Sequence, residues 1–415
     1  MLSTVVSGLR TLMSTRTETK LVAPYIFDTA RQEWVQFSRE THSPNPAQRL
    51  PHHLHLISWN IDFSREYADG RAVAAIDALR DHILQQNALH RTASLTSESH
   101  RDTYATKTRI FTISSDPDNL FPQLKNTGDV VFHADDAVPD LTEDAFQEAG
   151  GMLTSYPLIL QFQEVDRYAQ PHILAHPWIK KHFLSSKRGP DHYSSYFTMT
   201  LVDRRLAPFI FGYRSVPLPR TDMARDVLLF DLLTDSSSTP SPTPEIVRFA
   251  NTHLESLNFH KKRPEQLQFI SQLMKQPNVS AAFLSGDFNP IAPDDNTLVE
   301  TVGLRDLWTH RSTSGASPQP TTNDVQNGHG EVAELEQQTW GYWPRSEFPP
   351  RRFDKICASG SGKLAFGRVA RVAVGSQATF EELTDPEADP NSSPVPPETV
   401  WVSDHMAVEA YLSIL

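Results

Sequence analysis

The sequence of 415 residues predicts an α/β fold with its functional side chains at the ends of buried strands. Short apolar or β-branched runs recur along the chain, and each ends in a polar motif, as expected where strands of a buried sheet open onto a pocket. Residues 72–89 have the spacing of an amphipathic helix. The five polar motifs are Ser58-Trp59-Asn60-Ile61-Asp62, Gln163-Glu164-Val165, Thr252-His253-Leu254-Glu255-Ser256, Gly286-Asp287-Phe288-Asn289 and Ser403-Asp404-His405.

The first elements follow a segment without hydrophobic periodicity. We expect residues 1–50 to form a poorly structured N-terminal segment and residues 51–415 to form a single domain. The first predicted strand is Leu54 to Trp59, and the helix follows at Ala72 to Leu89. The apolar face of this helix consists of Ala75, Ile76, Leu79, Ile83 and Leu84.

The later strands are separated by turn and loop signals. Tyr156 to Phe162 leads into the Glu164 motif, and Ala281 to Leu284 leads into the Asp287 motif. Val227 to Leu233 and Ile246 to Thr252 flank a Pro-rich loop, which predicts an antiparallel pair. Because motifs from both halves of the chain are needed for one site, a single domain is favoured over two.

Four polar segments are too long for ordinary connections and are predicted to be insertions or loops. They cover about residues 91–150, 235–245, 312–336 and 383–399.

The motifs contain the groups that hydrolysis of a phosphate ester needs. A hard cation such as Mg²⁺, with Mn²⁺ as a substitute, is held through carboxylates and offsets the negative charge of the phosphate. Amide and imidazole groups can hold the phosphate oxygens, and one carboxylate can align the attacking water. No Cys-based or Gly-rich motif indicates a different chemistry.

Each motif alone also has a structural explanation. Asp287-Phe288-Asn289-Pro290 has the composition of an ordinary turn, His253 is compatible with a core histidine, and Trp59 is compatible with packing. It is the occurrence of all five motifs at the ends of apolar runs that favours one shared site.

In these motifs and their order, the chain resembles the endonuclease/exonuclease/phosphatase superfamily over about residues 54–415, and within it the tyrosyl-DNA phosphodiesterase 2-like proteins. The finer resemblance includes Pro217 to Leu229, Thr339-Trp340 and Arg352 to Ile356. The resemblance implies a four-layer α/β sandwich of the DNase I type, with two packed mixed sheets and helices outside.

The resemblance also implies roles for individual residues. Glu164 would be the main Mg²⁺ ligand, with Asn60 and Asp404 near the water shell of the metal. Asp287 would activate or orient the attacking water, and Asp404 would also fix the tautomer of a neighbouring histidine. The residues that would hold the phosphate oxygens are Asn289, His253, Ser256 and His405.

Further residues would support the site or the substrate. Asp354 would lie behind the catalytic groups, and Trp340 would flank a single-stranded DNA end. Arg220 and Arg225 are available for phosphate contact but are equally compatible with surface charge. The chain departs from the family pattern at Phe63, where the family usually has Gly, and after Asn289, where a basic residue is missing.

The resemblance implies a Mg²⁺-dependent phosphodiesterase that acts on 5′-tyrosyl-DNA adducts in DNA repair, with a DNA end, single-stranded or carrying a 5′ adduct, as its partner. Two alternatives stay open. The same site could act on RNA, abasic DNA or a phosphorylated small molecule, or the chain could be a non-catalytic binding module with this fold. The oligomeric state does not follow from the sequence.

Composition agrees with an intracellular enzyme that can approach DNA. The net charge is −12, but residues 129–148 hold seven acidic residues and residues 381–398 hold six, so the rest is close to neutral. The only cysteine, Cys357, excludes an intrachain disulfide and fits a reducing compartment. No apolar run is long enough for a membrane span. The acid-free residues 1–17 are compatible with a disordered tail or a mitochondrial presequence, so the nucleus, cytoplasm and mitochondrion stay open.

Overall fold

The computed structural model describes residues 19–38, 49–97, 156–187, 195–234, 244–257, 259–309, 337–360, 364–380 and 397–414, with side chains as far as residue 88 in helix α2 (Ala68–Ser97). The chain divides into two compact units, residues 1–82 with 156–415, and residues 83–155. Of the second unit, only the continuation of α2 over residues 83–97 is described. All other elements belong to the first unit.

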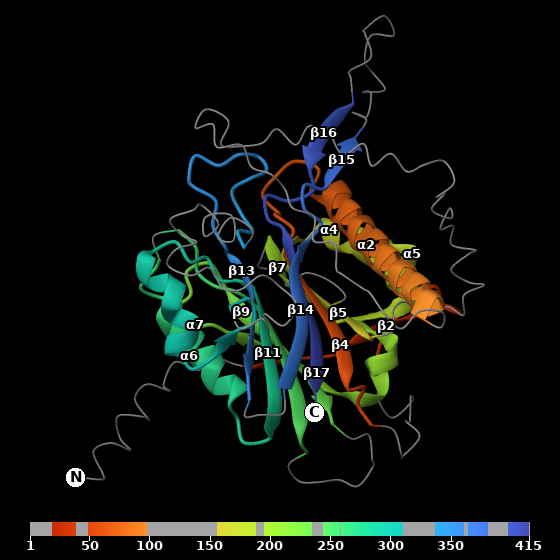
Figure 1. Ribbon diagram of the computed structural model, residues 1–415, viewed down its shortest axis with the longest axis horizontal. Coiled ribbons are helices and arrows are strands. Elements are labelled where there is room, and N and C mark those ends of the chain that lie inside the picture. Colours follow the sequence, from red (N-terminus) through yellow and green to blue (C-terminus); the bar gives the residue numbers. More distant parts are fainter. Residues whose placement is uncertain are drawn as a thin grey trace, which may run out of the picture. The chain divides into compact units, whose positions relative to one another are not determined.

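Two large mixed sheets form the first unit (Figure 1). The first sheet has the strand order β1 (Lys20–Val22), β8 (Ile210–Pro217), β9 (Asp226–Leu233), β10 (Ile246–His253), β11 (Val279–Asp287), β13 (Asp354–Ser359) and β12 (Arg305–Asp306). The second has the order β14 (Leu364–Val372), β17 (Ala407–Ile414), β4 (His53–Asn60), β5 (Leu158–Asp166), β7 (Tyr196–Asp203), β6 (Phe183–Ser185), β2 (Tyr25–Asp28) and β3 (Glu33–Gln36). A separate hairpin consists of β15 (Gln377–Phe380) and β16 (Glu398–Trp401).

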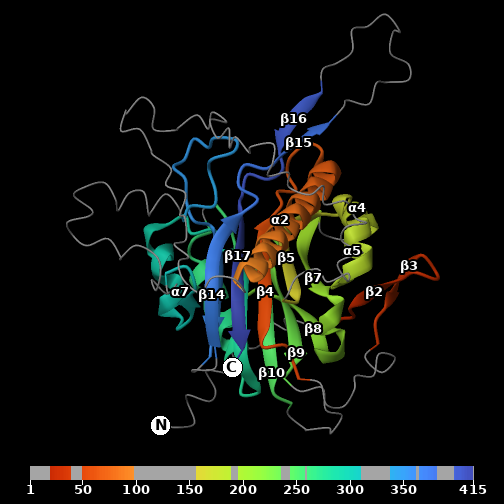
Figure 2. The same ribbon diagram turned by 45° about the vertical axis from the view of Figure 1, so that its right-hand side comes forward.

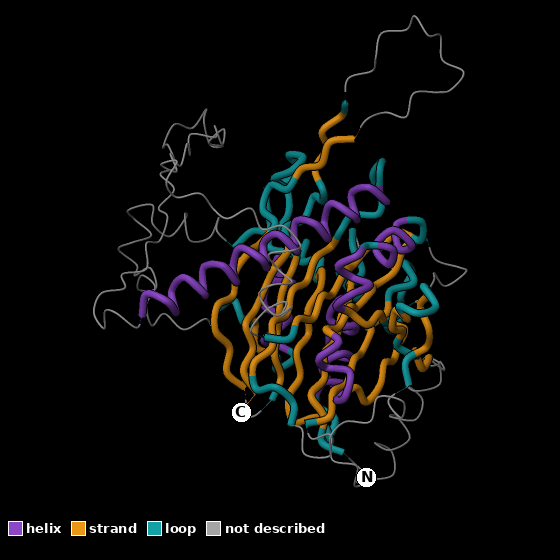
Figure 3. Tube along the Cα trace, turned by 90° about the vertical axis from the view of Figure 1, so that its right-hand side faces the viewer, coloured by secondary structure: helices purple, strands orange, loops and turns teal. Residues whose placement is uncertain are grey.

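The sheets pack face to face, and helices cover their outer faces (Figures 2 and 3). Between the sheets, the rings of Phe230, Phe249 and Phe283 follow one another at centroid distances of 5.9 and 5.4 Å. Outside the first sheet, Leu267 and Ile270 of α6 pack on its other face. This arrangement confirms the predicted four-layer α/β sandwich. The helical segments beside α2 are α4 (Ala169–Ala175), α5 (Pro177–His182), η3 (Arg204–Phe209), α6 (Arg263–Met274), η4 (Pro293–Thr297) and α7 (Leu298–Thr301).

Along the central strands, the residues that face the opposite sheet change from apolar to polar toward the carboxyl end. Side chains alternate between the two faces of a strand, so every second residue points into the space between the sheets. Both β4–β5 and β10–β11 are parallel pairs, so their carboxyl ends lie together. The inward rows are Leu54, Leu56, Ser58 and Asn60 in β4; Val247, Phe249, Asn251 and His253 in β10; and Ala281, Phe283, Ser285 and Asp287 in β11.

The predicted elements that precede the motifs are confirmed. β4, β9, β10 and β11 cover four of the predicted strands, and β5 begins two residues after the predicted start at Tyr156. β9 and β10 form the predicted antiparallel pair, with Phe230 opposite Phe249. The predicted helix lies within α2, where Ala75, Ile76 and Leu79 are buried.

The prediction for the N-terminal segment is wrong over residues 20–36, which form three strands. β1 pairs with β8 in the first sheet, while β2 pairs with β3 and β6 in the second. These strands have three or four residues, too few to show a hydrophobic period, and their stability comes from packing such as the edge-to-face contact of Phe27 with Trp34 at 5.8 Å.

The limits of a single domain over residues 51–415 stay a prediction. Most of the four predicted insertions lies outside the described residues, although residues 91–97 continue α2 and β16 begins at Glu398. Among the described residues, no helix is long and apolar enough to cross a membrane.

Candidate active site

Strand ends from both sheets bring polar side chains together in one place. Asn60 ends β4 in the second sheet, while His253 and Asp287 end β10 and β11 in the first. Asn60 Nδ2 lies 3.2 Å from Glu164 Oε1 and 3.1 Å from Asp287 Oδ2, so one amide donates to carboxylates of both sheets. The motifs of Asn60, Glu164 and Asp287 therefore contribute to a single site.

Gly286 allows β10 and β11 to approach closely beside the site. Its φ is +143°, and a Cβ at this position would lie 1.8 Å from the carbonyl oxygen of Thr252. Only glycine fits such a contact. His253 and Asp287 are neighbours across these strands, and His253 Nε2 lies 3.2 Å from Asp287 Oδ2.

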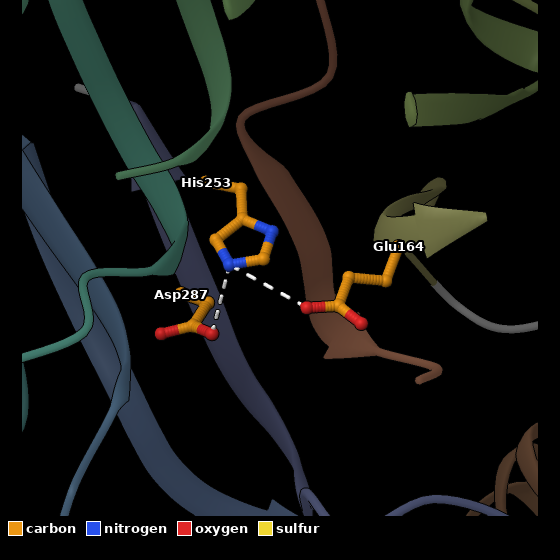
Figure 4. Close-up of side chains that lie close together, drawn as sticks. All are labelled: Glu164, His253 and Asp287. Atoms are coloured by element: carbon orange, nitrogen blue, oxygen red, sulfur yellow. Dashed lines mark ion pairs between the residues drawn. The ribbon is translucent and has the colours of Figure 1, made fainter. Parts of the chain in front are cut away.

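His253 lies between the two carboxylates, with Nε2 also 3.6 Å from Glu164 Oε1 (Figure 4). On its other side, Nη1 of Arg225 contacts Nδ1. Because a guanidinium can only donate, Nδ1 accepts and Nε2 carries the hydrogen. Burial and the charge of Arg225 lower the pKa of His253 to about 4, so the ring is neutral and its Nε2–H is a donor.

Asp287 is held in its ionised form. Burial disfavours the charge, but His253, His405 and the backbone N–H of Asn289 outweigh it and keep the pKa of the carboxyl below its usual range. Asn289 N donates to Oδ1 at 2.8 Å, whereas Oδ2 faces His253 and Asn60. An ionised carboxylate in this position can accept a proton from water.

His405 is paired with Asp354 at the start of β13. Its Nδ1 lies 2.8 Å from Asp354 Oδ2, and its Nε2 lies 3.8 Å from Asp287 Oδ2. Burial disfavours the imidazolium, but the carboxylates of Asp354 and Asp404 outweigh burial and raise the pKa of His405 well above its usual value. His405 can therefore donate a charged hydrogen bond from Nε2.

At Glu164, burial outweighs the effect of the nearby cations. Burial raises the pKa of its carboxyl to about 7, against the opposing effect of His405 and Arg225. Ligand atoms of Glu164, His253 and Asp287 lie within 4.8 Å of one another, which is a spacing suited to a metal ion. Because Nε2 of His253 carries a hydrogen, the carboxylate oxygens are the available ligands, and hard divalent cations prefer oxygen.

Asp404 and Trp340 lie together at the edge of the site. Trp340 Nε1 donates to Asp404 Oδ2 at 2.9 Å, and its ring stacks on Phe353 with centroids 4.7 Å apart. The prediction that Asp404 fixes the tautomer of a histidine is wrong for His405, because Asp354 occupies Nδ1. Asp354 and His405 are 51 residues apart in sequence and lie beside strands of different sheets, so only the tertiary structure shows which carboxylate faces the ring.

Two predicted phosphate ligands are engaged with protein groups. Asn289 Nδ2 donates to the carbonyl of Leu254 at 3.1 Å, and the Ser256 hydroxyl lies 3.2 Å from Met223 Sδ. The predicted roles of Asn289 and Ser256, and those of Asn60 and Asp404 near a metal, stay predictions. Arg225 is buried against His253, whereas Arg220 is largely exposed.

Sequence reasoning missed an aromatic pair beside the site, next to Arg225, which it had named for phosphate contact. The rings of Phe63 and Tyr196 stack with centroids 4.0 Å apart, and the guanidinium of Arg225 lies 5.0 Å from the Tyr196 ring centre. Buried Glu255 accepts from the backbone N–H groups of Asp222 and Met223 and so holds the loop before Arg225. The only sequence signal for this aromatic pair was that Phe63 follows the motif residue Asn60 closely in the sequence.

No protein-family model and no curated protein matches the chain. Solved structures that it resembles include TDP2 of Caenorhabditis elegans, with 14% identity, a TM-score of 0.44, and coverage of 87% of this chain and 74% of that one. D. rerio TDP2 complexed with a single-strand DNA product has 14% identity and a TM-score of 0.46, and the match covers 88% of this chain and 100% of that one. An endonuclease/exonuclease/phosphatase family protein of Bacteroides thetaiotaomicron has 12% identity and a TM-score of 0.44, and the match covers 89% of this chain and 97% of that one.

The last of these is described as a protein of the endonuclease/exonuclease/phosphatase family. The identities and TM-scores of these structures are too low to transfer an activity, so the function is inferred from the residues of the site itself.

Proposed function

We propose that this chain is a Mg²⁺-dependent phosphodiesterase that hydrolyses 5′-tyrosyl-DNA adducts by in-line attack of water. The observation that supports this most is the pairing of two carboxylates, buried Asp287 and partly buried Glu164, with three donors that face them. The donors are the Asn60 amide, the neutral His253 Nε2–H and the charged His405 Nε2–H. Carboxylates repel a phosphate unless a cation lies between them, so this combination favours a metal-assisted reaction.

Glu164 would hold the metal, with Asp287 beside it. The raised pKa of Glu164 supports this assignment, because a bound cation would stabilise the carboxylate that burial disfavours. When bound, a divalent cation would offset the charge of the phosphate and of the transition state.

The side chains of the chain would divide the remaining work. Asp287 would accept the proton of the attacking water, which requires the ionised form that its neighbours maintain. His405 and His253 would donate to phosphate oxygens and stabilise the charge that develops on them. A tyrosyl leaving group has a pKa near 10, so its oxygen leaves more easily than that of a sugar alcohol.

Aromatic side chains around the site support an aromatic substrate. Phe63 with Tyr196 lies on one side, and Trp340 lies beside Asp404 on another. Stacking on such rings holds a base without sequence preference, and Arg225 adds a positive charge near the phosphate site. A DNA end with a 5′ tyrosyl group combines these features. The alternatives stay RNA, abasic DNA or a phosphorylated small molecule.

The proposed location is inside the cell, in the nucleus or cytoplasm, with the mitochondrion as the alternative. The single cysteine, which is buried, supports a reducing compartment.

The experiment is cleavage of a single-stranded oligonucleotide with a 5′ tyrosyl group in Mg²⁺, with EDTA and the Asp287→Asn variant as controls. The expected result is metal-dependent release of tyrosine and a 5′-phosphate, lost in the variant. Asp231→Asn is the matched control, since Asp231 is a buried carboxylate that pairs with Arg248 in the same sheet. Hydrolysis of a generic phosphodiester without release of tyrosine would reject the 5′-tyrosyl-DNA adduct as the substrate and keep the reaction. DNA binding without any hydrolysis would favour a non-catalytic module.

A further inference from the structure

Glu164 lies at an irregularity of the second sheet. The pairing of β5 with β7 shifts between Phe162, which lies opposite Met199, and Val165, which lies opposite Phe197. Within this bulge Glu164 has a φ of +54°, a conformation that L-residues other than glycine seldom adopt. A bulge re-aims a side chain that strict alternation would point elsewhere. The direction of the Glu164 carboxylate therefore depends on what holds this bulge.

Asn251 of the opposite sheet contacts the first pair of the bulge. It is completely buried on β10, two residues before His253. Its Nδ2 donates to the carbonyl oxygens of Phe162 and Met199, each at 3.0 Å. One amide thus joins both strands of the bulge to the first sheet.

The orientation of the Asn251 amide is determined by its other contact. Its Oδ1 accepts from Gln163 Nε2 at 2.7 Å, and the same Nε2 lies 3.1 Å from Ser58 Oγ. Because two carbonyl oxygens need donors and Gln163 supplies one, only Nδ2 can face the carbonyls. Gln163 itself lies inside the bulge. Asn251 therefore contacts the bulge both through the backbone carbonyl groups and through the Gln163 side chain.

We propose that Asn251 is a positioning residue that holds the β5 bulge and thereby directs the Glu164 carboxylate into the site. This inference rests on the proposed function in one respect, the assignment of Glu164 as a metal ligand. Asn251 would not touch the substrate or the metal. It would act through the carbonyl groups of Phe162, two residues before Glu164, and of Met199 on the paired strand β7.

A second polar contact between the sheets provides a matched control. The Ser285 hydroxyl donates to Gln161 Oε1, and both residues are completely buried. This contact joins the same two sheets through side chains, without a bond to the carbonyls of the bulge. If any buried polar contact between the sheets were enough, Ser285→Ala and Asn251→Ala would have equal effects.

The experiment compares Asn251→Ala, Asn251→Asp and Ser285→Ala with the wild type. Mn²⁺ binding is measured by calorimetry without substrate at pH 8, where Glu164 is ionised. Asn251→Asp keeps the shape and the acceptor but removes the donors. Both Asn251 variants should bind Mn²⁺ about 10–100-fold more weakly, as is typical when support of a metal ligand is lost, while Ser285→Ala should bind normally. The metal concentration for half-maximal activity should rise while the KM for substrate stays unchanged.

Crystal structures of the variants separate this inference from the proposed function. Loss of the positive φ at residue 164, or a changed β5–β7 register, supports the inference even if the wild type binds no Mn²⁺, an outcome that would reject only the metal assignment. An unchanged bulge together with unchanged Mn²⁺ affinity would overturn it, and so would an equal loss in Ser285→Ala. If Asn251→Ala does not fold, Asn251→Ser serves for the same two measurements.

Discussion

Two buried carboxylates, Asp287 and Glu409, each lie between two imidazoles, yet their surroundings differ. Asp287 Oδ2 is 3.2 Å from His253 Nε2 and 3.8 Å from His405 Nε2. Glu409 Oε2 is 3.0 Å from Nε2 of both His55 and His82. Burial disfavours the charge of Glu409, but hydrogen bonds from the two histidines outweigh it and lower its pKa to about 2.

The difference lies in charge balance. Beside Asp287 there is a second carboxylate, Glu164, whose pKa is raised by burial. Beside Glu409 there is a further cation, with Arg368 Nε at 3.4 Å, and the ring of His55 stacks on Tyr411 at 4.2 Å. The same residue types therefore give an acidic site in one place and a charge-balanced contact joining β4, β17 and α2 in the other.

The largest expected effect is on catalysis by Glu164→Gln. Turnover should fall by about 10³-fold or more, because loss of the ligand charge removes metal assistance worth several kcal/mol. Steady-state kinetics over a range of Mg²⁺ concentrations would measure it. Near-normal turnover would show that the site around Asp287 does not depend on the Glu164 carboxylate. It would also contradict the functional difference between this site and the cluster around Glu409.

Glu409→Ala should instead affect stability. Removal of a buried carboxylate from two imidazoles should lower the free energy of unfolding by about 3–5 kcal/mol, while kcat of the remaining folded protein stays unchanged. Urea unfolding at pH 7 measures this. The control is Glu265→Ala, an exposed carboxylate paired with Arg220, which should cost at most about 1 kcal/mol. A loss of turnover without a loss of stability would place Glu409 in the catalytic machinery.

His405→Ala should reduce kcat by about 10²–10³-fold, the usual value of one preorganised donor. Asp354→Asn should have a smaller effect at neutral pH, but it should shift the pH profile. Without the Asp354 carboxylate the pKa of the His405 imidazole falls, so activity that needs the imidazolium is lost at a lower pH. If Asp354→Asn kept the pH profile of the wild type, the pairing of Asp354 with His405 would be structural only.

The smallest expected effect is a difference in the pH dependence of stability without metal. The folded-state pKa of Glu164 is raised from 4.5 to about 7, so its contribution to stability is lost as pH rises from 4.5 to 7. That of Glu409 is lowered from 4.5 to about 2, so its contribution is lost as pH falls from 4.5 to 2. Glu164→Gln should therefore stabilise the protein at pH 8 by on the order of 3 kcal/mol.

Urea unfolding of wild type, Glu164→Gln and Glu409→Gln from pH 3 to 8 would measure these slopes. Each substitution should remove only the slope of its own window. Slopes of the same sign in both windows would contradict the difference between the two clusters.

The motif residues could be predicted because strand periodicity is local. Asn60, His253 and Asp287 follow apolar runs in the sequence, and the alternation of side chains along a strand is enough to place them at an inward-facing end. Glu164 was identified only by its place after an apolar run, since alternation alone does not direct its side chain into the site and its orientation depends on a bulge that no local pattern indicated.

The sequence by itself determined which residue types stand at the strand ends and that the fold is an α/β sandwich. Only the tertiary structure decided the pairings: Asp354 with His405, Arg225 with His253, and Asn251 with the carbonyls of Phe162 and Met199. It also decided that His55 and His82 both hydrogen-bond to Glu409. The reason is physical. Hydrophobic period is set by neighbours in the chain, whereas the protonation and direction of a buried polar group are set by atoms that the packing of two sheets brings within hydrogen-bond distance.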